Sequence, residues 1–123
     1  MNAKILLDKE TITAASNKVT EIIDLDLDTI EGFFSVQLIV TGGGTAKIEY
    51  MNSNLATSLD TDYVVQSAAA DIIVSNFTAT SGPGSDGKDV ISFSPEPANR
   101  MKLKVTETGG VTAIAVTLII CVG

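Results

Sequence analysis

Two segments of this chain alternate apolar and polar residues so regularly that they constrain the fold more than any other feature. They span residues 33–40 and 100–107, and a period of two predicts β-strands with one buried face and one exposed face. The positions expected to face the core are Phe34, Val36, Leu38, Val40, Met101, Leu103 and Val105. The positions expected to face water are Ser35, Gln37, Arg100, Lys102, Lys104 and Thr106. Both segments therefore belong to sheets that cover an apolar core.

A glycine-rich turn follows each of these strands and leads into another strand-like segment. Gly42-Gly43-Gly44 leads into residues 45–50, and Gly109-Gly110 leads into a final strand within residues 111–122. Glycine adopts positive φ without strain, so both sites suit tight turns, and we expect two β-hairpins. The core-facing positions of the two returning strands are Ala46, Ile48, Tyr50, Ile114, Val116, Leu118, Ile120 and Val122. The last strand is apolar on both faces near its end, which predicts a central position or a covered surface.

The rest of the chain carries weaker strand signals, at residues 5–8, 19–27, 63–66, 72–77 and 90–93. Connections rich in Ser, Asn, Asp and Gly separate them, at residues 14–17, 52–62 and 80–88. Short strands between turn signals are typical of a β-sandwich or barrel. We therefore expect a single all-β domain over residues 1–123, an antiparallel, jelly-roll-like β-sandwich of about eight strands.

The charge balance excludes two classes of partner. The chain has fifteen acidic and eight basic residues, for a net charge of −7. Nucleic acids and anionic membranes attract basic surfaces, so neither is an expected partner. The apolar run 111–122 is shorter than the roughly 20 residues of a membrane-spanning helix, and no signal peptide is visible. We expect a soluble protein made in the cytoplasm, with its single cysteine, Cys121, buried and inert in that run.

The sequence also argues against an enzyme. It contains no histidine, the commonest general base and the commonest neutral metal ligand. Carboxylate-only chemistry of the glycosidase kind is an alternative that the absence of Trp disfavours. Gly82–Lys88 has the G-x-x-x-x-G-K spacing of a phosphate-binding loop, but Asp89 follows where Ser or Thr should hold magnesium. Residues 90–95 after it suggest a strand, whereas such a loop needs a helix whose N-terminus faces the phosphates. We expect no catalytic residue, metal or cofactor.

Two polar groups remain as candidates. Asp24, Asp26 and Asp28 would share one face of a strand, about 7 Å apart at a rise of ~3.3 Å per residue. Calcium could use such a row, but the glycine-containing loop of a calcium motif is absent, so a solvated acidic face is expected. Asn52-Ser53-Asn54 and the loop down to Asp62 offer a polar binding surface that indicates no particular ligand.

Four stretches within residues 19–122 appear in an order that resembles small β-sandwich proteins from the structural-gene modules of tailed bacteriophages and prophages. They are Gly32–Gln37, Gly44–Tyr50, Thr80–Gly82 and Arg100–Gly110. The resemblance rests on strand and turn patterns, and no catalytic signature accompanies it. It implies a virion structural protein, a capsid decoration or cement protein that lies on the capsid surface and stabilises contacts between capsomers.

The resemblance implies the major capsid protein or other virion proteins as partners, and we expect a homo-oligomer. Two alternatives stay open: a carbohydrate- or receptor-binding sandwich module, and a tail, neck or head-fibre component of the same virion. Residues 1–13 contain the candidate contact residues Ile5, Leu6 and Leu7. This segment is expected either as an arm that adds a strand to a neighbour's sheet or as the first strand of the domain itself.

Overall fold

A computed structural model describes residues 2–24, 34–55, 59–65, 74–78, 88–93 and 100–122. This part of the chain forms strands and one short 3-10 helix, in the following order. They are β1 (Asn2–Ile12), β2 (Asn17–Val19), β3 (Ile23–Asp24), β4 (Phe34–Gly42), β5 (Thr45–Ser53), η1 (Asp60–Asp62), β6 (Val64–Val65), β7 (Val74–Thr78), β8 (Lys88–Phe93), β9 (Arg100–Glu107) and β10 (Ile114–Val122).

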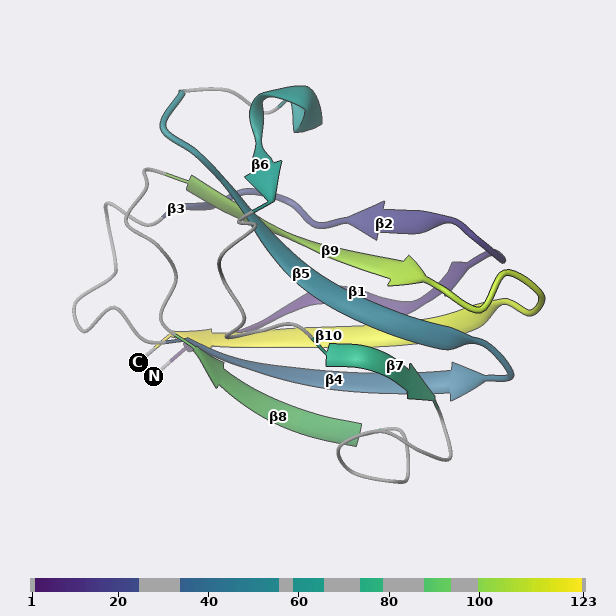
Figure 1. The fold of residues 1–123 in the computed structure, drawn as a ribbon. Helices are drawn as coiled ribbons and strands as arrows, with labels where there is room; N and C mark the ends of the chain where they lie inside the picture. Colours follow the sequence, from purple (N-terminus) through teal and green to yellow (C-terminus); the bar gives the residue numbers. More distant parts are fainter. Residues whose placement is uncertain are drawn as a thin grey trace.

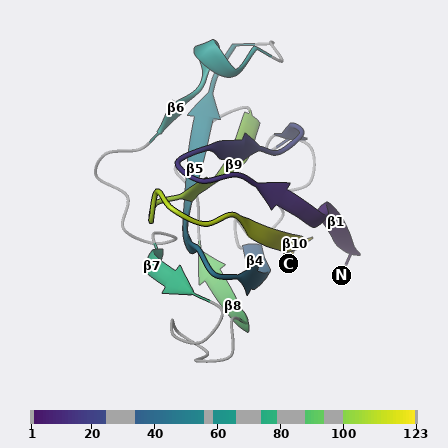
Figure 2. The same cartoon turned by 90° about the vertical axis from the view of Figure 1, so that its right-hand side faces the viewer.

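The strands form two antiparallel sheets that lie one over the other (Figure 1). The first sheet has the order β1-β10-β4-β8. The second sheet has the order β2-β9-β5-β6, in which β3 also pairs with β9 and β7 also pairs with β5. Figure 2 gives the end-on view, with β10 and β4 between β1 and β8. The prediction of an all-β chain is confirmed, and the described residues contain ten strand segments against about eight expected.

The inner faces of the two sheets share one apolar cluster. It contains Leu7, Ile12, Val36, Leu38, Val40, Ala46, Ile48, Tyr50, Met101, Leu103, Val105, Ile114, Val116, Leu118 and Ile120. Leu38 of the first sheet and Leu103 of the second sheet are both 0% exposed. The predicted core positions of residues 36–40, 46–50, 101–105 and 114–120 are thus confirmed, whereas the side chains of Phe34 and Val122 lie outside the described residues. Burial of both inner faces against each other is the main favourable term that holds the sheets together.

Both predicted hairpins are wrong, although their strands are correct. β4 does not pair with β5, since β4 lies between β10 and β8 while β5 lies in the other sheet. In the same way β9 and β10 belong to different sheets. Alternation says which face of a strand is buried but not which strand lies beside it, so a turn between sheets and a turn within one give the same pattern. The last strand, β10, is central in its sheet, as predicted.

The two connections between sheets meet at one end of the molecule. A Cβ atom on Gly44, in the β4–β5 connection, would collide with the carbonyl oxygen of Thr112 in the β9–β10 connection. It would also lie 2.7 Å from Cγ2 of Ile114. Glycine at this position is therefore needed for the close approach of two backbones, a reason different from the free turn geometry expected from the sequence.

Candidate interaction surface

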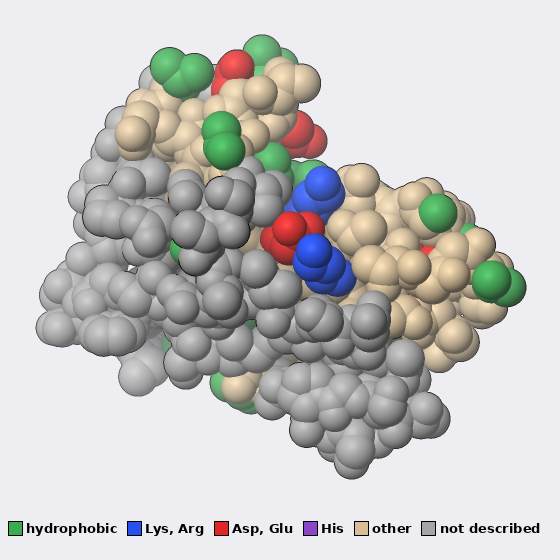
Figure 3. Space-filling model, viewed as in Figure 1, with side chains coloured by type: hydrophobic (Ala, Val, Ile, Leu, Met, Phe, Trp, Pro, Cys, Tyr) green, Lys and Arg blue, Asp and Glu red, His purple; other side chains and the backbone are tan. Residues whose placement is uncertain are grey.

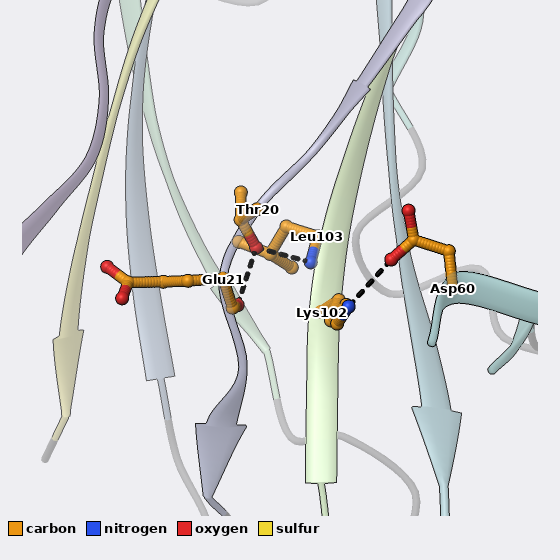
Figure 4. A network of polar contacts seen from close by, with 5 residues as sticks. All are labelled: Thr20, Glu21, Asp60, Lys102 and Leu103. Atoms are coloured by element: carbon orange, nitrogen blue, oxygen red, sulfur yellow. Dashed lines mark hydrogen bonds and ion pairs between the residues drawn. The ribbon is translucent and has the colours of Figure 1, made fainter. Parts of the chain in front are cut away.

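Lys102 corrects one detail of the predicted alternation. It lies on the outward side of β9, where the pattern predicts a solvated side chain, yet its side chain is only 6% exposed. Its Nζ lies 2.6 Å from Oδ1 of Asp60. Figure 4 marks this contact with a dashed line. The same ammonium group lies 4.8 Å from the centroid of the Tyr63 ring, a distance at which a cation is attracted by the ring face. A buried lysine is stable only with such partners.

These contacts hold a segment that we call the shelf, the described residues 54–55 and 59–65, against the outer side of the second sheet. In the shelf, Val64 and Val65 pair with Asn52 and Met51 of β5. Arg100 Nη1 also donates a hydrogen bond to the carbonyl oxygen of Leu55, at 3.2 Å. Beneath the shelf Met51 and Ser53 are buried, although both lie on the outward side of β5.

The surface of the shelf combines three exposed apolar side chains with the exposed polar residues Asn54, Asp60 and Thr61. Leu55 is 58% exposed, and Leu59 and Val64 are each 64% exposed. Figure 3 shows hydrophobic side chains, together with acidic ones, gathered over η1 and β6. Scattered single apolar residues are ordinary on a protein surface, but a group of them on one short segment marks a candidate interaction site.

The polar surface predicted for residues 52–62 is wrong at Asn52 and Ser53, while Asn54, Asp60 and Thr61 are exposed as predicted. Asn52 and Ser53 are 5% and 6% exposed, so of the predicted Asn-Ser-Asn triplet only Asn54 faces water. Among the described residues, Nδ2 and Oδ1 of Asn52 make no hydrogen bond. The exposed described positions of the shelf are divided between polar residues, Asn54, Asp60 and Thr61, and apolar residues, Leu55, Leu59 and Val64.

Charged side chains lie beside the shelf on the outer side of the second sheet. Glu49 of β5 lies directly opposite Lys104 of β9, and Lys47 Nζ lies 3.8 Å from Glu49 Oε2. Figure 3 shows these kinds of side chain gathered over β5 and β9. A partly exposed surface pair of this sort contributes about 0–1 kcal/mol to stability, so its main effect is to keep this face polar.

Glu107 is the strongest polar centre at the opposite end of β9. It is 1% exposed, and its carboxylate accepts hydrogen bonds from four backbone amides. The donors are Ala15 and Gly110 to Oε1, at 3.1 and 2.7 Å, and Thr45 and Gly109 to Oε2, at 2.8 and 2.7 Å. These bonds, foremost those from Thr45 and Ala15, lower the pKa of Glu107 to about 2. A carboxylate held ionised and saturated with donors is suited to structure rather than to proton transfer.

The sequence contains a signal for Glu107 that the prediction did not use. Glu107 continues the inward phase of Met101, Leu103 and Val105, so it had to be buried if the strand continued that far. Two glycines follow two and three residues later, which is where flexible backbone can turn its amides back onto a carboxylate. No comparable signal exists for Asp60 and Tyr63, whose contacts with Lys102 join segments far apart in the chain.

The candidate contact residues Ile5, Leu6 and Leu7 lie in β1, which pairs with β10 of the same chain and is an edge strand of the first sheet. Ile5 is 57% exposed, whereas Leu7 is 6% exposed and belongs to the core. Leu6 is partly buried and packs against that core. Only Ile5 is thus placed to meet a partner without leaving the core, and the contact role of the segment stays a prediction.

The remaining sequence candidates are placed only in part. The glycine-rich loop 82–87 lies outside the described residues, but Lys88 begins β8, so a strand follows the loop as predicted. The backbone of Asp24 lies in β3, while its side chain and residues 26 and 28 lie outside the described part. Cys121 is partly exposed on the outward side of β10, so the prediction that it is buried is wrong.

Two general findings apply to the described part of the chain. It contains no cluster of three or more His, Cys, Asp or Glu side chains arranged to hold a metal ion. It also contains no helix long and apolar enough to span a membrane.

Comparison with known proteins adds no identity. Neither the models of known protein families nor the curated proteins include a match to this chain.

Proposed function

We propose that this protein is a non-enzymatic structural component of a virion that binds the outside of a bacteriophage capsid and reinforces contacts between capsomers. The observation that carries the proposal is the shelf, a surface with three exposed apolar side chains that a partly buried ion pair holds against the second sheet. The resemblance described for residues 19–122 supplies the kind of partner.

The strand order supports a jelly-roll as the underlying fold. β2 and β3 lie one after the other along β9, and β6 and β7 lie one after the other along β5. Counting each of these two sets as one interrupted strand gives eight strands, arranged as four nested pairs. The pairs are β1 with β10, β2/β3 with β9, β4 with β8, and β5 with β6/β7. A jelly-roll folds from this nested arrangement, and viral capsid domains and lectins both use it.

A fixed shelf suits a protein that binds passively. Because Lys102, Asp60 and Tyr63 hold the segment in place, its exposed leucines and valine lose little conformational entropy when a partner covers them. Each of these side chains would contribute about 1.5–3 kcal/mol on full burial. If many copies bind, each contact with a capsomer would gain the free energy of burying these side chains.

The carbohydrate-binding alternative has less support. Sugar sites commonly stack a sugar ring on an exposed aromatic side chain, but Tyr50 and Tyr63 are 2% and 6% exposed. The phenylalanine side chains lie outside the described residues, so this argument rests on the tyrosines. A place in the tail, neck or fibre makes the same demands on the surface as a capsid location, and the experiment below separates the two.

The test is co-sedimentation of the purified protein with mature capsids of the encoding phage or prophage, after the capsids have been stripped of it. We expect saturable binding at a stoichiometry that matches a symmetry site of the shell. A variant with Leu55→Ser, Leu59→Ser and Val64→Thr should bind at least a hundredfold more weakly, since it removes three side chains worth about 1.5–3 kcal/mol each.

The matched control is Val111→Thr, which removes an apolar group that is 87% exposed at the other end of the molecule. It should bind like the unchanged protein. Failure of the unchanged protein to bind capsids, with recovery in tails or fibres, would move it elsewhere in the virion. Equal binding by the shelf variant and the control would reject the shelf as the contact surface.

A further inference from the structure

The described outward residues of the first sheet include few charged ones. On the strands of this sheet the buried side chains point toward the core. The residues that alternate with them therefore point outward. Four of the outward residues are large and apolar: Ile5, Ile39, Val90 and Ile119. Gln37 lies among them and Cys121 lies beside them, and the other described outward residues on β1, β4 and β10 away from the bulge are Ala, Ser or Thr.

These apolar residues form a continuous group across the sheet. Ile5 lies opposite Ile119, Ile119 lies opposite Gln37, and Gln37 lies opposite Val90, which makes one row over all the strands of the sheet. Ile39 lies next to that row, opposite Thr117. Ile5 and Val90, at the two edges, are 57% and 60% exposed. Directly opposite side chains in a sheet are close neighbours, so this group is one surface.

Among the residues that the structure describes, charge appears only at the rim of this surface. Lys88 lies on the edge strand β8, and Asp8 and Lys9 lie in a bulge of the edge strand β1 opposite Thr117. The outer side of the second sheet is different, with Lys47, Glu49 and Lys104 on its central strands. An apolar centre within a charged rim is the usual anatomy of a protein interface.

We propose that a second copy of this chain covers this face, so that two copies stack through the outward sides of their first sheets. Each chain carries a net charge of −7, so two copies repel one another wherever acidic residues meet. The described centre of this face has no acidic side chain, which makes it the place where close contact costs least. In a two-fold arrangement each face meets its equivalent, and the amide of Gln37 can both donate to and accept from its counterpart.

The size of the face fits this occupant. The four strands have 11, 9, 9 and 6 residues. At a spacing of about 4.8 Å and a rise of ~3.3 Å per residue they cover on the order of 500 Å² in projection. Specific interfaces begin at roughly 600 Å² per partner, and the relief of side chains raises the accessible area above its projection. The contact uses a surface other than the shelf, so it does not depend on the proposed capsid function.

The first experiment is sedimentation equilibrium of the purified protein from low to high micromolar concentration. We expect a reversible dimer, with twice the mass of one chain at high concentration. The double variant Gln37→Glu and Val90→Glu places charges at two exposed positions of the face. The two positions lie directly opposite each other, so the charges also repel within one chain, but only weakly while both stay in water. It should weaken dimerisation by at least about a hundredfold, because like charges meet across a two-fold contact.

The matched control is Thr106→Glu, which adds the same kind of charge to the outer side of the second sheet and should dimerise normally. The shelf variant should dimerise normally as well, so loss of capsid binding and loss of the dimer can be told apart. A protein that is monomeric throughout the concentration range, or an oligomer that the double variant leaves intact, would overturn the proposal.

Cys121 allows a second test without any substitution on the face. It is the single cysteine, it is partly exposed, and it lies in the row next to Ile119. Its rate of alkylation by a maleimide should fall as protein concentration rises through the dimer range and should stay constant in the double variant. A rate independent of concentration in the unchanged protein would place Cys121 outside any contact and reject this face.

Discussion

Glu107 is the residue on which one end of the molecule depends. Its two oxygens join the turn after β1, the β4–β5 connection and the β9–β10 connection through backbone amides of Ala15, Thr45, Gly109 and Gly110. These amides lie at strand ends and turns, where a sheet leaves donors unpaired, and an unpaired buried donor is costly. One ionised side chain thus takes the place of several separate turn bonds.

We predict that Glu107 makes stability fall in acid. Its pKa is about 2 in the folded chain, against the ordinary value of 4.5 expected when unfolded. A lowered folded pKa stabilises the fold fully above the unfolded value and loses that effect as pH falls from about 5 to about 2. The Glu107→Gln variant should melt at a lower temperature at pH 7, because its NH₂ group would face backbone donors. Melting curves by circular dichroism at pH 7 and pH 2.5 measure both effects.

The control for this prediction is Glu21→Gln, at a side chain that is 55% exposed and paired with Lys4 at 3.2 Å. It should leave the melting temperature at pH 7 nearly unchanged, as expected of an exposed pair. If Glu107→Gln melts like the control at neutral pH, or loses as much stability in acid as the unchanged protein does, the carboxylate does not act as described.

Replacing Asp60 should lower the free energy of unfolding more than replacing Lys102. Asp60→Asn leaves a lysine that is 6% exposed without its carboxylate, and we expect a loss of about 1–3 kcal/mol in the free energy of unfolding. Lys102→Met keeps an apolar side chain of similar length against Tyr63 and leaves Asp60, which is 57% exposed, to water. That variant should stay within about 1 kcal/mol of the unchanged protein. Urea unfolding of both variants gives the comparison, and equal losses would contradict the asymmetry.

At the scale of strands, the sequence predicts which side of each strand is buried but not which strands pair with it. The inward positions of β4, β5, β9 and β10 follow from a period of two and agree with burial at every described position. The pairing failed because Gly42–Gly44 and Gly109–Gly110 favour a turn without saying whether the chain returns in the same sheet or crosses to the other. A sandwich uses both kinds of turn.

The candidate site was less predictable than the strands. Lys102 has the sequence context of a solvated residue, and its burial depends on a shelf that begins more than 40 residues earlier. A strand pattern carries no information on what a distant loop covers. The same limit applies to the outward face of the first sheet, where Ile5, Val90 and Ile119 come from three separate parts of the chain. Sequence shows each residue singly, and only the register of the sheet brings them together.

The whole molecule is dominated by pairs of strands that are distant in sequence. Asn2 pairs with Val122 and Ile12 with Ile114, so the outermost pair joins the two ends of the described chain. Both termini lie side by side at one end of the sandwich (Figure 1). Bringing such distant strands together costs conformational entropy before the contacts between them can stabilise the chain. Proteins with distant strand pairs fold slowly for that reason.

A circular permutant tests this account. A short Gly-Ser linker joins residue 123 to residue 1, and new ends are opened between Val111, which is 87% exposed, and Thr112, which is also exposed. The β1–β10 pair then closes a loop of about 6 residues instead of about 110, which lowers the closure cost by about 2–3 kcal/mol. The bonds of Glu107 to Gly109 and Gly110 remain, since both glycines stay on its side of the cut.

We expect the permutant to keep the native circular dichroism spectrum and to refold about tenfold faster in stopped-flow experiments, if about half of the lower closure cost is felt in the transition state. The control is the unpermuted chain with the same linker as a C-terminal tail. A native permutant that refolds at the rate of the control would mean that β1 and β10 meet only after the rate-limiting step. The folding nucleus would then lie in the pairs that the new connection leaves unchanged, β9 with β5 and β4 with β8.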